Sequence, residues 1–353
     1  MLLQERLNAF VQLGNFLRAF TTAGKSDDRE SDALLHHAIE EAGIINPWFT
    51  EKNIRMALSS LGRQLEEQNL HRWTASYPFP DHTDQKPATV GVVTAGNIPL
   101  VGFHDFLCVL VSGHRFLGKL SSRDDKLLKT LASILLSIEP RFTGNIVFTD
   151  EFLRGYHAVI ATGNNNSARY FEYYFRDVPH IIRKNRNGIA VLTGNETGEA
   201  LERLAHDVFS YFGLGCRSVS KLYVPEGYNF SAFFEACQEW SEIIYHHHYA
   251  NNYEYNKAVF LVNKIPHLDN GFLLVKEDSA LASPVAVLYY EYYKDPVRLH
   301  EKLSGITEQI QCIVSDTWDK SPSVPFGKAQ DPELWDYADG IDTLQFLLQL
   351  KGA

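Results

Sequence analysis

The stretch Ala88-Thr89-Val90-Gly91-Val92-Val93-Thr94-Ala95 decides the fold. It is a short and almost continuous apolar run, which is typical of a strand buried on both faces of a sheet. Gly96 ends the run, and residues 76–87 before it form a connector rich in proline and aspartate. The sequence therefore predicts a buried strand that is entered from a loop and left at a glycine turn.

Segments with strand character and segments with helix character alternate after this run. We expect strands at 115–120, 145–148, 156–161 and 189–192, and helices at 103–111, from Asp124 as N-cap to Leu135, at 163–175 and at 197–211. The alternation predicts an α/β fold whose parallel sheet is covered by helices on both faces. Such sheets bind ligands at the carboxyl ends of their strands, so the loops after Ala95, Leu120 and Ala161 are the expected cofactor sites.

The regions on either side have their own patterns. Residues 1–70 are expected to be helical, with Thr50 as the N-cap of one helix. A second unit is expected near Phe212, with a strand at 220–224, a helix at 230–247, strands near 258–262 and 285–289, and a loop followed by a helix in the tail 324–350.

The composition excludes several classes of protein. The 353 residues suffice for two domains, and the net charge of −10 argues against a nucleic-acid-binding surface. No window of 18 uncharged apolar residues occurs, so we expect no membrane-spanning helix; residues 1–20 fit an amphipathic helix, with transient membrane contact left open. The four cysteines are not spaced for a metal site or a disulfide framework, which predicts a reducing, cytoplasmic location.

The segment Tyr211-Phe212-Gly213-Leu214-Gly215-Cys216-Arg217-Ser218 carries the strongest chemical signal. Its glycines allow positive φ and close approach of a ligand to the backbone. A thiol on such a turn, beside Arg217, could have a lowered pKa and act as a nucleophilic thiolate. Cys216 is therefore the candidate catalytic residue, and a packed structural cysteine is the alternative.

Asn97 follows the buried strand directly. Its side-chain amide can donate a hydrogen bond, and with the backbone N–H of a nucleophile it would form an oxyanion hole, worth about 3 kcal/mol per donor. The alternative is an asparagine that only tolerates a left-handed turn. Thr94 and Ala95, at the end of the strand, are expected to contact a cofactor.

Two further loops are expected to bind the cofactor. The junction of Gly163, Asn164 and Ser167 offers backbone amides to a pyrophosphate or a nicotinamide, although it lacks the GxGxxG pattern and an ordinary capping loop is equally compatible with it. In the loop after the 115–120 strand, Lys119 can reach a ribose hydroxyl and Ser122 can accommodate a 2′-phosphate. A solvated charged loop is the alternative there.

Two other runs suggest different functions. His246-His247-His248 suggests a metal site, but consecutive histidines point to different sides of a helix, whereas i, i+4 spacing places two ligands on one face. We therefore expect no bound metal. The run Tyr289-Tyr290-Glu291-Tyr292-Tyr293 is expected to serve packing rather than base stacking.

Taken in order, these segments resemble the fatty acyl-CoA reductase family that supplies aldehyde to bacterial luciferase, within the aldehyde dehydrogenase superfamily. The resemblance runs from about residue 88 to the C-terminus. Its strongest parts are 95–106, 211–220, Asn251-Asn252-Tyr253-Glu254-Tyr255-Asn256-Lys257, Ser283-Pro284-Val285, Pro325-Phe326-Gly327 and Asp339-Gly340-Ile341-Asp342.

The resemblance implies an aldehyde dehydrogenase-like fold with the active site between two domains. Its parts are a helical segment 1–75 packed on a Rossmann-like cofactor domain, which consists of 76–205 with 325–353, and a smaller α/β catalytic domain, 206–324. It also implies that Cys216 is acylated, that Asn97 stabilises the oxyanion, that Lys119 binds ribose, and that 163–167 lies beside the nicotinamide.

Departures from the superfamily pattern are informative. The general-base Glu of hydrolytic members is missing, because the corresponding stretch Ile182-Arg183-Lys184-Asn185-Arg186-Asn187-Gly188 holds no carboxylate. Water is then poorly activated, and acyl groups should pass to and from a thiol carrier instead. Ser122 replaces the usual acidic residue near the ribose, which favours NADPH over NADH. Ala280 stands where a nicotinamide-ribose Glu is usual.

The implied activity is reduction of fatty acyl thioesters, from acyl-CoA or acyl carrier protein, to aldehydes with NADPH or NADH. One alternative is an oxidising dehydrogenase that acts on free aldehydes. The other is an acyl-transfer or scaffold protein that kept the fold and lost the cofactor. We expect no nucleic-acid partner and no stable membrane insertion, and we leave a homo-oligomer open.

Overall fold

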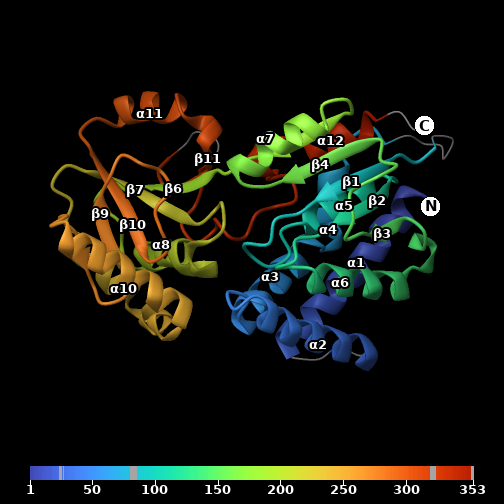
Figure 1. The fold of residues 1–353 in the computed structure, drawn as a ribbon, viewed down its shortest axis with the longest axis horizontal. Helices are drawn as coiled ribbons and strands as arrows, with labels where there is room; N and C mark the ends of the chain where they lie inside the picture. The colour runs from blue at the N-terminus through green and yellow to red at the C-terminus, as the bar shows by residue number, and fades with distance from the viewer. Residues whose placement is uncertain (24–25, 27, 80–85, 319–322, 351–353) are drawn as a thin grey trace. The chain divides into compact units, whose positions relative to one another are not determined.

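The computed structural model describes residues 1–23, 26, 28–79, 86–318 and 323–350 (Figure 1). The chain forms two compact units, Met1–Lys184 with Glu333–Ala353, and Asn185–Pro332. The division therefore falls earlier in the chain than the expected boundary between 205 and 206. Strand β6 (Asn187–Val191) and helix α8 (Gly198–Phe209) belong to the second unit, because β6 pairs with two strands of its sheet and α8 packs on that sheet.

Four helices open the first unit, as the sequence predicts. They are α1 (Leu3–Ala23), α2 (Arg29–Ile45), α3 (Glu51–Gln64) and α4 (Glu67–Thr74). The Thr50 side chain accepts a hydrogen bond from the Asn53 amide at 3.3 Å, which confirms Thr50 as the N-cap of α3. Within the described part of the chain, no helix is long and apolar enough to cross a bilayer.

A five-stranded parallel sheet forms the centre of the first unit. In spatial order its strands are β3 (Ile146–Phe148), β2 (Arg115–Lys119), β1 (Thr89–Val93), β4 (Ala158–Thr162) and β5 (His180–Arg183). β1 is the central strand, and the side chains of Val90 and Val92, which project from one face of the sheet, are fully buried. The predicted α/β fold with a parallel sheet is confirmed.

The helices cover both faces of this sheet. α5 (Phe103–Val111) and α6 (Lys126–Ile138) connect β1 to β2 and β2 to β3, whereas α7 (Asn165–Tyr174) connects β4 to β5. These two sets of connections run outward from the centre in opposite directions, so right-handed crossovers place them on opposite faces. Figure 1 shows α7 on one side of the sheet and α6 with α1 on the other.

Two details of this unit differ from the sequence prediction. Asp124 does not cap α6: the N-cap position is Asp125, without a side-chain cap bond, and the Asp124 carboxylate accepts the Leu100 amide instead. Strand β5 was not anticipated, because its four residues begin with His180 and end with Arg183 and so lack an unbroken apolar run.

A buried ion pair joins β5 to the returning C-terminal segment. The Arg183 guanidinium donates to both carboxylate oxygens of Asp105, on α5, at 2.6 and 2.9 Å, and to the Thr343 hydroxyl at 2.8 Å. Thr343 begins α12 (Thr343–Leu348), the helix that the sequence predicts in the tail. All three side chains are buried, so the desolvated charge pair joins β5 to α5, and the hydrogen bond from Arg183 to Thr343 attaches the C-terminal helix to it.

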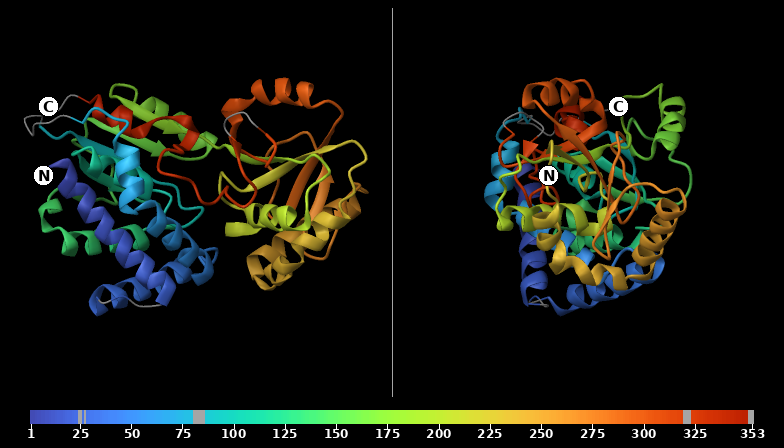
Figure 2. Two further views of the ribbon diagram at one scale, coloured as in Figure 1. Left: turned by 180° about the vertical axis from the view of Figure 1, so that it is seen from behind. Right: turned by 90° about the vertical axis from the view of Figure 1, so that its left-hand side faces the viewer.

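A seven-stranded sheet forms the centre of the second unit. In spatial order its strands are β12 (Ser323–Val324), β11 (Ile310–Val314), β6, β7 (Val219–Pro225), β10 (Val287–Tyr293), β9 (Leu274–Glu277) and β8 (Leu268–Asp269). All neighbours are parallel except β8 and β9. Figures 1 and 2 show α11 (Pro296–Ser304) over one face and α8 with α10 (His247–Val262) over the other.

Several predictions for the second unit are wrong. Residues 258–262 lie in α10 and not in a strand; Phe260 is buried, whereas Leu261 and Val262 are 60% and 81% exposed. A short apolar run does not by itself distinguish a strand from a helix. The single helix expected at 230–247 is divided into α9 (Ser231–Ala236), the 3-10 segment Cys237–Tyr245 and the start of α10. The sequence did not predict α11, β9 or β11.

Removal of the Asp105 carboxylate should destabilise the protein strongly. Asp105→Ala leaves the Arg183 guanidinium buried without its counter-charge, which costs about 3–5 kcal/mol of unfolding free energy. Urea denaturation measures the loss. Arg141→Ala, which breaks an exposed pair with Glu139, is the control and should cost less than about 1 kcal/mol. Equal losses in the two variants would show that the buried pair has no special weight.

Candidate active site

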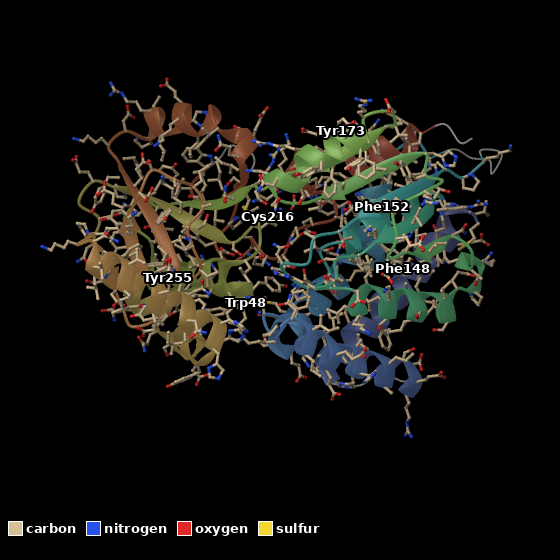
Figure 3. The ribbon with its side chains drawn as sticks, viewed as in Figure 1. Trp48, Phe148, Phe152, Tyr173, Cys216 and Tyr255 are labelled. Atoms are coloured by element: carbon tan, nitrogen blue, oxygen red, sulfur yellow. The ribbon has the colours of Figure 1, made fainter. Side chains whose placement is uncertain are left out.

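Cys216 lies on the loop between α8 and β7, and it is labelled in Figure 3. The approach to it is an unusual backbone: Tyr211, Phe212 and Gly213 have φ of 53°, 58° and 74° in succession. Glycine adopts such φ values freely, whereas for each aromatic residue this conformation raises the free energy by roughly 1–2 kcal/mol. Packing offsets this strain, because Tyr211 is buried and the Phe212 ring lies 4.3 Å from that of His246.

Two hydrogen bonds between Gly215 and Ser218 close the turn that contains Cys216. The Ser218 amide donates to the Gly215 carbonyl at 3.0 Å, and the Gly215 amide donates to the Ser218 hydroxyl oxygen at 3.2 Å. Cys216 and Arg217 therefore lie inside a small ring of reciprocal hydrogen bonds. This arrangement fixes the backbone N–H of Cys216, the predicted oxyanion donor, within a defined turn.

The inner side of this turn lies against β6. A methyl group added at Gly188 would come within 2.5 Å of the Arg217 carbonyl oxygen and 2.6 Å of the Ser218 carbonyl oxygen. Only glycine fits at this contact, since both clashes are with backbone. Gly188 ends the stretch 182–188, and nothing local in the sequence indicates this packing role.

The four cysteines differ sharply in exposure. Cys216 is exposed, whereas Cys108, Cys237 and Cys312 are buried. Burial raises the pKa of the Cys108 and Cys237 thiols. Cys216 is thus the thiol that solvent and reagents can reach, as a nucleophile requires.

In the first unit, the sheet order reverses direction between β1 and β4. The loops after these two strands carry Asn97 and Gly163, and the ends of neighbouring strands at a reversal of this kind form a binding crevice. Asn97 is exposed, whereas Thr94 is buried and its hydroxyl oxygen accepts the Ser121 amide at 3.2 Å. Gly96 is also buried, and an added methyl group would lie 2.5 Å from the Ser121 hydroxyl oxygen.

The loop that carries Asn97 is held by Asp124. One carboxylate oxygen of Asp124 accepts the Leu100 amide at 2.7 Å, where Leu100 has a positive φ of 63°. The other oxygen is buried and, among the described residues, has no hydrogen-bond partner. Burial raises the pKa of Asp124 to about 7, although the Leu100 bond lowers it. This residue was missed as a loop anchor because it looks like a helix cap in the sequence.

The third loop predicted to bind the cofactor, 163–167, contains the N-cap of α7. The Asn164 side chain accepts the Ser167 amide at 2.8 Å and so caps α7, which means that this amide is already used by the protein. A methyl group added at Gly163 would lie 2.9 Å from the Ser167 Cβ. The structure therefore supports the capping alternative for Asn164 and Ser167, and it places both at the helix terminus where an anion is favoured.

Lys119 and Ser122 occupy the neighbouring strand end. The Lys119 ammonium donates to the carbonyl oxygens of Asp150 and Glu151 at 3.3 and 2.9 Å, and lies 5.2 Å from the centre of the Phe152 ring. Ser122 is exposed. Lys119 thus anchors the loop after β3, where Figure 3 labels Phe152, in addition to any ribose contact.

The histidine run is part of a helix start. His246 is the N-cap of α10, and its ring accepts the Tyr249 amide, while His247 and His248 are the first residues of the helix. Among the described residues, no group of three or more His, Cys, Asp or Glu side chains is placed to hold a metal ion.

The tyrosine run lies in β10, where Tyr290 packs on Phe230 at 4.8 Å between ring centres.

No protein-family profile matches the sequence, and no curated protein matches it. Solved structures do match. One is the indole-3-acetaldehyde dehydrogenase of P. syringae in complex with NAD+ and IAA, at 10% identity over 89% of this chain and 72% of that chain, with a TM-score of 0.61. Another is aldehyde dehydrogenase 21 of Physcomitrella patens in complex with the reaction product succinate, at 14% identity over 98% and 87%, with a TM-score of 0.60.

A third match is an oxidoreductase from Marinobacter aquaeolei, at 9% identity over 90% of this chain and 74% of that chain, with a TM-score of 0.62. Identities this low establish the shape of the backbone and leave the chemistry open. The chain has the aldehyde dehydrogenase fold, as the predicted fold class states.

Asparagine at position 124 should change how stability depends on pH. The folded pKa of Asp124, about 7, lies above the ordinary value, so its stabilising contribution is fully present below about pH 4 and is lost as pH rises through 7. Asparagine does not titrate and keeps an oxygen for Leu100. The unfolding free energy of Asp124→Asn, relative to the unsubstituted protein, should rise by about 2–3 kcal/mol between about pH 5 and pH 8.

Urea denaturation across this pH range measures that difference. Asp125→Asn, at the partly exposed neighbour, is the matched control and should show no comparable rise. The burial argument fails for Asp124 if both variants follow the pH profile of the unsubstituted protein.

Iodoacetamide should modify Cys216 in the native protein well before Cys108, Cys237 and Cys312. Alkylation needs an accessible thiolate, and the latter three thiols are buried. Peptide mass spectrometry over a time course gives the four rates, and urea-denatured protein is the control in which all four cysteines react. Labelling of Cys237 at the rate of Cys216 would contradict the exposure found here.

Proposed function

We propose that this chain reduces fatty acyl thioesters, carried by coenzyme A or by acyl carrier protein, to aldehydes with NAD(P)H. The observation that carries the proposal is Cys216, an exposed thiol on a glycine turn in a chain with the aldehyde dehydrogenase fold. The other three cysteines are buried, so they do not compete for this role. A cytoplasmic location and association with further copies of the chain are part of the same proposal.

The chemistry begins on the sulfur of Cys216. The thiolate attacks the thioester carbonyl carbon and forms a new C–S bond. The old C–S bond then breaks, and the carrier leaves as a thiolate that takes up a proton. The backbone N–H of Cys216 stabilises the oxyanion, and Asn97 keeps its predicted role as the second donor. A nicotinamide cofactor, when bound, would supply the hydride that reduces the acyl group. Cys216 then leaves as its thiolate when the C–S bond breaks, and the aldehyde departs.

The absence of a carboxylate from the stretch 182–188 supports this direction of the reaction. The charged side chains of this stretch are all cations: Arg183 is paired with Asp105, and Lys184 with Glu172 at 2.7 Å. This stretch supplies no carboxylate that could take a proton from water, so hydrolysis of an acyl-Cys216 is slow. Transfer to a thiol or reduction then becomes the productive outcome.

The first unit offers residues that fit a dinucleotide. The reversal of strand order between β1 and β4 supports this fit, and Gly96 and Gly163 are close-packed glycines that keep the two loops against the strand ends. Thr94, Ala95, Lys119, Ser122, Gly163, Asn164 and Ser167 are the residues that would hold the cofactor. The exposed and uncharged Ser122 supports NADPH, since it does not repel a 2′-phosphate.

Oxidation of free aldehydes is the second candidate. The structural neighbours favour this oxidation, because two of the three described above are named dehydrogenases of aldehydes, and one of those two was solved with NAD+. The two candidates give different products. The first consumes thioester and reduced cofactor and forms an aldehyde, whereas the second consumes aldehyde and oxidised cofactor and forms a carboxylic acid.

Radiolabelled acyl thioester should mark the protein at Cys216 when no reductant is present. Addition of NADPH should then release the label as aldehyde, because hydride transfer completes the reaction. Cys216→Ala should take up no label, whereas Cys237→Ala, at a buried thiol, should label normally. Full reductase activity of Cys216→Ala, or release of the label as acid, would reject the proposal; the second result would favour the oxidising dehydrogenase.

A further inference from the structure

Asp207 lies near the C-terminal end of α8 and is completely buried. One carboxylate oxygen accepts the Gly327 amide at 2.6 Å, and the other accepts the Ala329 amide at 3.0 Å. Burial raises the pKa of this carboxyl group to about 7, although both amide bonds lower it. Burial of a carboxylate is unfavourable unless it is hydrogen-bonded, and the two amides that compensate Asp207 belong to one loop.

The segment that Asp207 binds is residues 325–330, which we name the 325–330 loop. The Phe326 amide donates to Asp316 at 3.0 Å, and Gly327 has a φ of 83°. Phe326 and Ala329 are buried. The bonds of three backbone amides, those of Phe326, Gly327 and Ala329, therefore fix the path of this loop, and two of them end on the single carboxylate of Asp207.

The 325–330 loop in turn holds the two residues that follow Cys216. The Ala329 carbonyl oxygen accepts the Arg217 Nε–H at 2.5 Å, and the Gln330 side-chain amide donates to the Ser218 hydroxyl oxygen at 3.0 Å. The same Ser218 oxygen accepts the Gly215 amide and closes the turn around Cys216. A continuous chain of hydrogen bonds thus runs from Asp207 to both sides of Cys216.

We propose that Asp207 is a positioning residue for Cys216, acting through the 325–330 loop. It does not touch the sulfur. It sets the place of Ala329 and Gln330, and these set the place of Arg217 and Ser218. The inference rests on the proposed function in one respect: it is the acyl acceptor Cys216 that the turn presents.

Hydrogen–deuterium exchange of Asp207→Asn tests the chain of bonds. Asparagine keeps one acceptor oxygen but replaces the other with an amino group, so one of the two loop amides loses its partner. Exchange should rise by at least about tenfold both in the 325–330 loop and in residues 215–218. A rise confined to the loop would overturn the proposal.

A second variant separates this effect from general loss of stability. Gln330→Ala cuts the chain after Asp207, so exchange should rise at 215–218 while the Gly327 and Ala329 amides stay protected. Asp269→Asn is the control, because the Asp269 carboxylate also holds groups of this unit, namely the Tyr253 hydroxyl, the Lys257 ammonium and the Gly271 amide, and none of these bonds involves residues 215–218. Unchanged exchange at 215–218 in Gln330→Ala would also overturn the proposal.

The pH profile of Cys216 alkylation gives a readout that a merely structural role would not move. In Asp207→Asn and Gln330→Ala, the midpoint should differ from that of the unsubstituted protein, because the Gly215–Ser218 turn no longer holds the thiol in one fixed setting beside Arg217. Asp269→Asn should keep the midpoint of the unsubstituted protein, and an unchanged midpoint in all variants counts against positioning. Neither measurement uses thioester or cofactor, so this inference and the proposed function can fail independently.

Discussion

The hydrogen bonds from the Gly327 and Ala329 amides to the buried carboxylate of Asp207 are the interaction on which the presentation of Cys216 depends. A reactive thiol must be exposed, and an exposed turn has few contacts of its own to define its shape. The structure meets this requirement from the buried side. The inner backbone of the turn packs on Gly188, and its side chains reach a loop whose amides end on Asp207.

The first unit uses buried carboxylates in the same manner. Asp124 holds the amide of Leu100 in the loop that carries Asn97, and Asp105 holds the guanidinium of Arg183 beside the C-terminal helix. Each of these groups is expensive to desolvate. Both oxygens of Asp105 accept hydrogen bonds from Arg183, whereas only one oxygen of Asp124 accepts a bond, from the Leu100 amide, and the pKa of Asp124 is raised. The loops at the sheet edge are therefore fixed by polar bonds to the interior, while the strands themselves are held by apolar packing.

The candidate site is rigid where its backbone has to be precise and exposed where chemistry has to occur. Tyr211 and Phe212 keep a strained backbone because their side chains are packed. This backbone leads directly into the hydrogen-bonded turn from Gly215 to Ser218. Cys216 remains exposed within that ring. In the first unit, the Asn164 side chain accepts the Ser167 amide, and the Lys119 ammonium donates to two carbonyl oxygens. Residues predicted to hold a cofactor therefore also fix the conformation of these loops.

The sequence by itself determined the α/β class, the helical start, the parallel strands around Ala88–Ala95 and the glycine turn at Cys216, because local hydrophobic pattern and turn chemistry encode these features. It did not determine that residues 258–262 are helical, since five apolar residues carry no period. Only the tertiary structure decided that Asp207, inside a predicted helix, and Asp124, an expected helix cap, are anchors for loops. Their partners lie 120 and 24 residues away in the chain, and burial of a carboxylate depends on what folds over it.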